Sequence, residues 1–357
     1  MNNIGTQTNS REETTMKKIM LVAVAIMLVA AVAVSAADAP ITKIGLGHVI
    51  SIKSSKDATA TATAVGQVDT VMAAVAFDAA GRVVKVSIDN AQTKVNFDKD
   101  MKVVSDVTVA PKTKVELKEG YGMAKVSTIK LEWYQQMANF EKWMIGKTVA
   151  EIKALKVKTR DASHTNVPDI PELTSLVTIT VESYIAAVED AWNNAVTVKA
   201  GGVKLGLGQN VSIKSSKSAT DTVAPVAQVD CVMAATLFDA AGKVVETIVD
   251  NGQTKVNFDK TGKVTSDKNA EYKTKKELKE GYGMAKVSTI KLEWYQQMEN
   301  FEAWMAGKTV AQIQALKVKT RDASHTNVPD VPELTSLVTI TVESYIAAVA
   351  ESFANAK

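Results

Sequence analysis

The sequence predicts an α+β fold, an antiparallel sheet followed along the chain by helices that pack on it, and it predicts this fold twice. Apolar residues alternate with period two in the first part of each half and recur at helical spacing in the second part. The two halves also repeat each other at a constant offset of 161 residues. Strands first and helices later are typical of an α+β layer fold.

The repeat is clearest in the Gly-Tyr-Gly-Met segment at residues 120–123, which returns at 281–284. No gap is needed to keep this offset from Ile44 to Ala195, and so long a period indicates a duplicated domain rather than a solenoid. The sequence therefore divides into a signal segment (1–37), a first copy (38–198), a short linker (199–202) and a second copy (203–357). We expect each copy to fold by itself.

The N-terminal segment has the three parts of a secretory signal peptide. Lys17 and Lys18 precede an apolar run over residues 19–34, and small residues follow at 35–37. We expect translation to start at Met16, cleavage to follow Ala36 or Ala37, and the mature protein to be exported, extracellular or at the cell surface. The alternative is an uncleaved membrane anchor, which is the one membrane contact that the sequence predicts.

The first elements of each copy are strands. In residues 71–77 the odd-numbered and the even-numbered positions are both apolar, and a turn follows at 78–81. In residues 84–88 valine or isoleucine alternates with polar residues. This pattern predicts a β-hairpin whose second strand has one buried face. Residues 44–53 and 93–97 are expected to form further strands.

The second part of each copy is helical. Apolar residues at helical spacing predict an amphipathic helix over residues 127–145. Thr148 and Glu151 then form the capping box of a short helix. A polar, proline-containing loop over 158–175 leads to a last helix, whose apolar positions are Val181, Tyr184, Ile185, Val188 and Trp192.

Composition excludes some classes of protein. The net charge is only +3 and is spread along the chain, so no basic face for nucleic acid is predicted. The richest basic run, residues 273–279, is interpreted as a solvated helix face. The single cysteine, Cys231, rules out an internal disulfide and lies in an apolar run, which predicts a buried, unreactive thiol.

Three segments of each copy resemble the FMN-binding domain family and its relatives, the membrane-anchored major immunogen lipoproteins. They are the hairpin at 77–88, the segment that begins with Gly120-Tyr-Gly-Met and continues through Glu132-Trp-Tyr to Gly146-Lys-Thr, and the segment 175–188. The resemblance implies an exported binding module that holds a flavin or a similar aromatic ligand, used in electron transfer outside the membrane.

Family members with covalent flavin carry FMN on the threonine of a Ser-Gly-Ala-Thr element. The resemblance therefore assigns Thr178 and Thr339 as flavin-binding residues, with Ser175 and Ser336 at the start of the element. Leucine and valine replace the Gly-Ala pair here, at 176–177 and again at 337–338, so we expect no covalent attachment. The alternative role for Thr178 or Thr180 is to cap the last helix.

Two tyrosines between glycines, Tyr121 and Tyr282, are placed to stack on a flat ligand, whereas Trp133 lies on the apolar helix stripe and is assigned to the core. His164 stands near Asp161 and Asp169 in a loop that is repeated around His325. Its spacing matches no established metal site, so a solvated loop is expected and no metal ligand is assigned.

No catalytic residue is assigned either. No Ser-His-Asp or Cys-His pairing is apparent, His48 is not shared because Gln209 replaces it in the second copy, and Gly45-Leu-Gly47 lacks the rest of a dinucleotide fingerprint. The first hypothesis is thus an exported, non-catalytic FMN-binding-like module. The alternatives are a cell-surface structural or adhesive protein without cofactor and, third, a secreted enzyme.

Overall fold

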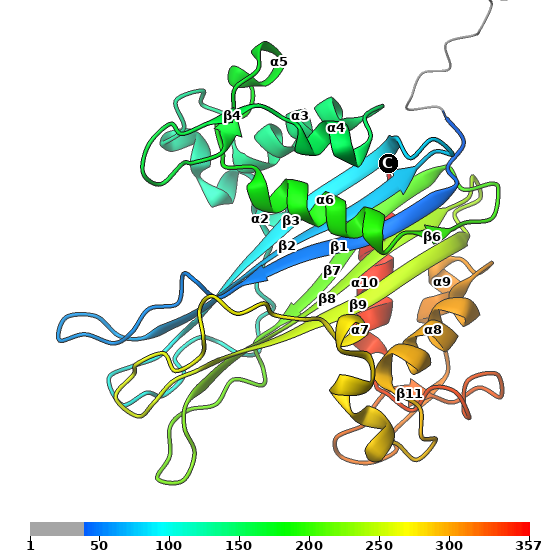
Figure 1. Cartoon of the computed structure of the whole chain (residues 1–357). Coiled ribbons are helices and arrows are strands. Elements are labelled where there is room, and N and C mark those ends of the chain that lie inside the picture. The colour runs from blue at the N-terminus through cyan, green and yellow to red at the C-terminus, as the bar shows by residue number, and fades with distance from the viewer. Residues whose placement is uncertain (1–38) are drawn as a thin grey trace, which may run out of the picture.

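The computed structural model describes residues 39–357, so the expected signal segment and its cleavage site lie outside the described residues. The predicted fold class is confirmed: the chain is α+β, with antiparallel sheets and helices that follow them in each half (Figure 1). In the described part of the chain, no helix has the length and apolar character needed to span a membrane.

The first sheet consists of β1 (Lys43–Ser51), β2 (Val65–Phe77), β3 (Val83–Asn96) and the short β6 (Val196–Thr197), in the order β3-β2-β1-β6. The expected separate strand at 93–97 is wrong. Residues 93–96 are the end of β3, which pairs with β2 along its whole length from Asn96 opposite Val65. Buried polar residues at Asp89 and Asn90 interrupt the alternation and hide this continuity in the sequence.

The second sheet repeats the first at the same offset. It contains β7 (Lys204–Ser212), β8 (Val226–Phe238) and β9 (Val244–Asn257), in the order β7-β8-β9. The edge strand β7 pairs with residue 357, because Leu205 and Lys357 exchange two backbone hydrogen bonds.

The two sheets pack face to face, and this shared layer joins the halves. One apolar core contains residues from both sheets, among them Met72 and Met233, and the rings of Phe97 and Phe258 lie with their centroids 5.1 Å apart. The opposite face of each sheet forms a second core with its own helices. The molecule is therefore four layers thick, with helices outside and sheets inside (Figure 1).

The helices that cover the sheets follow the predicted order. In the first half they are α3 (Trp133–Met144), α4 (Val149–Lys153) and α6 (Glu182–Asn193). The predicted helix at 127–145 starts six residues later than expected, because Glu132 is its N-cap. The predicted capping box is confirmed: Thr148 accepts from the Glu151 backbone N–H, and the Glu151 carboxylate accepts from that of Thr148.

The second half has α8 (Trp294–Met305), α9 (Val310–Gln314) and α10 (Glu343–Ala354) in the same order. Short elements connect the main ones in both halves: α2 (Lys114–Leu117), η2 (Lys118–Tyr121), η3 (Met123–Lys125), β4 (Val157–Lys158), β5 (Val167–Pro168), α5 (Pro171–Thr174), α7 (Lys275–Leu278), η4 (Lys279–Tyr282), η5 (Met284–Lys286), β10 (Val318–Lys319) and β11 (Val328–Pro329).

Besides the shared core, hydrogen bonds between loops at one end of the sheets connect the two halves. The backbone N–H of Ala58 donates to the carbonyl of Gly262 at 2.9 Å, and the equivalent N–H of Ala219 donates to Met101 at 2.9 Å. These reciprocal bonds, together with the shared core, argue against the expectation that each copy folds by itself.

The glycines of the Gly45-Leu-Gly47 segment allow α6 to approach β1 closely. A Cβ atom at Gly45 would lie 1.8 Å from the carbonyl oxygen of Ala191, and one at Gly47 would lie 2.0 Å from that of Ala187. The obstacle is helix backbone, which cannot rotate away as a side chain can. This close contact, and not a nucleotide, explains the Gly-x-Gly spacing.

We expect Gly45→Ala to destabilise the protein by about 3 kcal/mol, because the added methyl group forces helix and sheet apart. Denaturant unfolding monitored by circular dichroism measures this loss. Gly120→Ala is the matched control, since its Cβ would meet no atom within 4 Å, and we expect it to change the free energy of unfolding by less than about 0.5 kcal/mol. Equal effects of the two changes would contradict the explanation.

Candidate functional site

The residues assigned to flavin by resemblance are held by other side chains of the protein. The hydroxyl of Thr178 donates to the amide oxygen of Gln136 at 3.3 Å, and its backbone N–H donates to the same oxygen at 2.9 Å. Thr339 repeats both bonds with Gln297. Ser175 and Ser336 are exposed.

The alternative role of these threonines as helix caps is wrong. The N-cap of α6 is Val181, which has no side-chain cap bond. The hydroxyl of Thr180 donates instead to the carbonyl oxygen of Thr165 at 2.8 Å. The chain thus turns through Thr178 and Thr180 before the helix begins, and the threonines fasten that turn to neighbouring segments.

The aromatic faces are covered by a lysine of the same half. The ammonium of Lys114 lies 4.9 Å from the centroid of the Tyr121 ring and 5.4 Å from that of Trp133, and Lys275 has the same relation to Tyr282. A flat ligand on that face of the Tyr121 ring would have to displace this lysine. Lys275 is 7% exposed, so the interpretation of residues 273–279 as a wholly solvated face is wrong.

The structure also shows where Trp133, Cys231 and the loop around His164 lie. Trp133 is buried in the helix-side core, as predicted. Cys231 is buried too, and burial raises the pKa of its thiol to about 12. His164 is hydrogen-bonded to Asp161 at 2.7 Å on the surface, while Asp169 pairs with Lys158 instead. Within residues 39–357 no group of three or more His, Cys, Asp and Glu is arranged to hold a metal.

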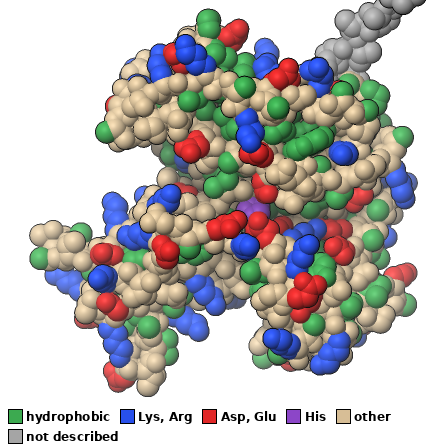
Figure 2. Space-filling model, viewed as in Figure 1, with side chains coloured by type: hydrophobic (Ala, Val, Ile, Leu, Met, Phe, Trp, Pro, Cys, Tyr) green, Lys and Arg blue, Asp and Glu red, His purple; other side chains and the backbone are tan. Residues whose placement is uncertain are grey.

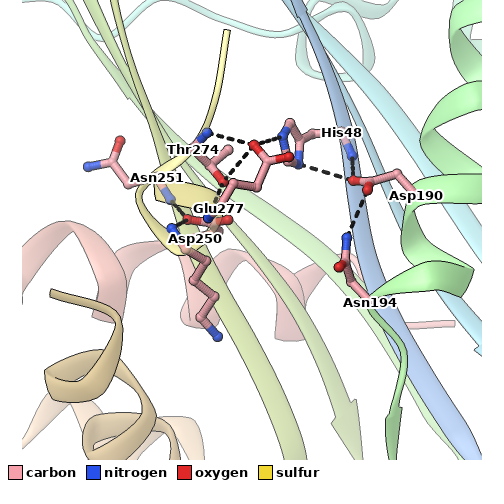
Figure 3. A network of polar contacts seen from close by, with 8 residues as sticks. His48, Asp190, Asn194, Asp250, Asn251, Thr274 and Glu277 are labelled. Atoms are coloured by element: carbon pink, nitrogen blue, oxygen red, sulfur yellow. Dashed lines mark hydrogen bonds and ion pairs between the residues drawn. The ribbon is translucent and has the colours of Figure 1, made fainter. Parts of the chain in front are cut away.

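A polar site outside the residues assigned by resemblance lies where the two halves meet, around His48 on β1. Its ring atom Nε2 is 3.0 Å from Oε2 of Glu277, on α7 of the second half. Its Nδ1 is 3.3 Å from Oδ2 of Asp190, on α6 of the first half, and the same oxygen accepts the backbone N–H of His48 at 2.9 Å. Figure 3 shows the imidazole between the two carboxylates.

Local structure positions Glu277 for this contact. Thr274 is the N-cap of α7, and Glu277 is the third residue of that helix in a complete capping box. The backbone N–H and the hydroxyl of Thr274 both donate to Oε2 of Glu277, the oxygen that faces the histidine. Asp250 lies beside this group and accepts the backbone N–H of Lys276 (Figure 3).

The charges around His48 favour its protonated form. Burial alone would lower the pKa of His48, but the hydrogen bond and charge of Glu277, with the charges of Asp190 and Asp250, outweigh burial and raise that pKa above 6.5. Burial would likewise raise the pKa of Glu277, yet the bonds from His48 and Thr274 hold it at about 2. The pKa of Asp190 is raised, chiefly by burial.

The equivalent position in the other half lacks a cation. Gln209 replaces His48, and its amide donates to Glu351 at 2.7 Å and its backbone N–H to the same carboxylate at 2.8 Å. Burial, together with the nearby Glu116 and Asp89, raises the pKa of Glu351 to about 7. The two sites have equivalent backbone positions and carboxylates, but only the site at His48 has a titratable base between the carboxylates.

His48 forms part of the floor of an open cleft of about 690 Å³ between the halves, which we call the seam cleft. Figure 2 shows a histidine at the bottom of a hollow between the two lobes, with acidic side chains around it. Carboxylates outnumber lysines in the lining, which includes Glu246, Lys276, Glu299 and Glu302. Its volume falls within the range typical of small-molecule sites.

Glu302 is a buried acid of the seam cleft. One oxygen, Oε1, accepts the backbone N–H of Val249 at 2.6 Å and the ammonium of Lys276 at 2.7 Å. Burial raises the pKa of this carboxyl to about 7, although Lys276 opposes the shift. Burial also raises the pKa of Glu246, which in the described part of the chain has no ion-pair partner.

Comparison with known protein families, with characterised proteins and with solved structures found no match to this chain. The resemblance to FMN-binding domains therefore stays a prediction.

The seam cleft cannot be recognised in the sequence, because its residues are far apart along the chain and His48 is not repeated. One signal was present: Thr274 and Glu277 have capping-box spacing. That spacing predicts the helix start, but it does not show that the carboxylate faces a histidine 229 residues away.

We expect the contribution of His48 to stability to depend on pH. Because the folded-state pKa is raised, the stability that wild type gains over His48→Gln is fully present below the unfolded pKa of about 6.5 and is lost as pH rises through the folded pKa. Urea unfolding of both proteins at pH 6 and pH 9 measures the difference. The same comparison in a Glu277→Gln background should show less pH dependence; an unchanged dependence would contradict the role of Glu277.

Proposed function

We propose that the protein is an exported, non-catalytic binding module in which the two halves act as one body and the ligand occupies the seam cleft. The observation that supports this best is the cleft itself, which is open to solvent, about 690 Å³ in volume and lined by side chains of both halves. Its polar groups are fixed in place: Glu277 by a capping box, and Glu302 by a backbone N–H and a lysine.

The test is a ligand screen with a variant that closes the cleft. Val196, which lines the cleft and is 40% exposed, is replaced by lysine, the residue at the equivalent position 357 of the other half. Small molecules of both charge signs, FMN included, are screened by thermal shift against wild type and Val196→Lys. We expect at least one compound to raise the melting temperature of wild type alone. Equal shifts in both proteins, or none in either, would refute ligand binding in the seam cleft.

Flavin binding at Thr178 and Thr339 remains a separate part of the proposal. Arg160 supports it, because its guanidinium donates to the carbonyl oxygen of Thr178 at 2.8 Å and so supplies a cation beside this residue. We expect free flavin at most. The intact mass and absorption spectrum of the secreted protein test this: a chain that starts near Ala37 or Asp38, without added FMN mass, is the expected result. Flavin mass lost in Thr178→Ala with Thr339→Ala would show covalent attachment.

The cofactor-free structural or adhesive protein is the second candidate. The observation that favours it is the continuous core between the sheets, reinforced by reciprocal loop bonds, because such a body resists separation of its halves. A protein of this kind would be colourless and would bind no compound in the screen.

A further inference from the structure

We infer that the seam cleft binds an alkylammonium group, either of a free aliphatic amine or of a lysine side chain in a peptide. The inference rests on the proposed function and adds the chemical class of the ligand. It is carried by a comparison within the molecule, since the other half contains the equivalent cleft and that cleft holds an ammonium group.

In the equivalent cleft the occupant is Lys357, the last residue of the chain. Its ammonium lies 2.6 Å from Oε2 of Glu141, the counterpart of Glu302. Its side chain borders two small clefts, of about 230 and 340 Å³, and Glu141 and Ala138 line both as well. A lysine side chain thus occupies and divides the space that remains open on the other side.

In the seam cleft the residue at that position is Val196, so the space is not occupied by the protein itself. Glu302 instead pairs with Lys276, which approaches the carboxylate from α7. The residue equivalent to Lys276 in the first half is Val115, so this lysine is present in the second half alone. The inner wall therefore keeps its charge balance without the lysine that the other half inserts.

The charge of the outer wall differs between the two clefts. Lys85 and Ala138, which line the 340 Å³ cleft beside Lys357, are replaced in the seam cleft by Glu246 and Glu299. In the described part of the chain neither glutamate has an ion-pair partner. The space that a lysine stem fills in one half is thus open in the other and bordered by two unpaired carboxylates, which suits an ammonium group on an alkyl stem.

The experiment titrates the full mature chain with cadaverine and, separately, with the peptide Gly-Lys-Gly, and follows binding by calorimetry at low and high salt. Glutarate and 1-pentanol serve as anionic and neutral probes of similar length. We expect binding of one or both ammonium probes, weakened by salt, and none of the other two. Preference for cadaverine identifies a free amine as the ligand; preference for the peptide identifies a lysine side chain.

The variant Glu246→Lys with Glu299→Ala installs the residues of the other half and should weaken ammonium binding by about tenfold or more. Glu172→Lys with Glu333→Ala makes the same charge change at exposed positions outside the cleft and should leave binding unchanged. Val196→Lys should abolish binding by supplying the ammonium from the chain.

Two outcomes separate this inference from the proposed function. If a neutral or anionic compound binds wild type and not Val196→Lys, the cleft is a binding site but the ammonium class is wrong. If equal loss of cadaverine and Gly-Lys-Gly binding occurs in the cleft variant and in the surface control, the effect is one of net charge and the inference is overturned.

Discussion

Residues 203–357, expressed without the first half, are expected to form a dimer and not a stable monomer. Separation would expose the apolar face of β7, β8 and β9, which includes Leu207, Met233 and Phe258 and is buried against the other sheet in the whole chain. Monomeric proteins rarely expose so large a continuous apolar surface. The outer face would keep its own helices and core, so each half has a frame on which to dimerise.

Dimerisation is favoured because the two halves already pack through equivalent surfaces. Phe258 meets its counterpart Phe97, and a Cβ at Gly66 would lie 2.2 Å from that of its counterpart Ala227, so the same face is on both sides of the contact. Such a surface is suited to an isologous pair. Light scattering and melting at several concentrations measure the result, since a dimer melts at a concentration-dependent temperature. A monomer with a cooperative, concentration-independent transition would show that each copy folds by itself after all.

Trp133→Ala is expected to reduce the free energy of unfolding by roughly 3–5 kcal/mol, the usual cost of removing a fully buried large aromatic side chain. Trp133 is 1% exposed, and its indole N–H donates to the hydroxyl of Tyr184 at 3.1 Å. Its loss also removes one of the two rings that flank the buried ammonium of Lys114, leaving that charge less compensated.

The second half provides a matched repeat of this test. Trp294 has the same burial, the same bond to Tyr345 at 3.0 Å and the same lysine beside it, so Trp294→Ala should cost a similar amount. Val126→Ala, at a position 83% exposed, is the control and should stay within about 0.5 kcal/mol of wild type. A loss below about 1 kcal/mol in both tryptophan variants would mean that the rings do not support the core.

Much of each half could be predicted because it depends on neighbours along the chain. Alternation marked the hairpin, helical spacing marked the stripe from Trp133 to Met144, and the capping box at Thr148 marked a helix start. Errors arose where distant groups decide. Residues 93–96 belong to a long strand because its partner β2 is equally long, and Thr178 fastens a turn because Gln136 reaches it.

The sequence by itself determined the α+β class, the repeat at constant offset and the burial of the main apolar positions, since periodicity and turn chemistry act over a few residues. Only the tertiary structure decided what covers the second apolar face of β2, because a pattern shows that a face is buried but not which surface buries it. That choice stacked the two sheets, set His48 between carboxylates of different halves and left the seam cleft open where Val196 stands in place of a lysine.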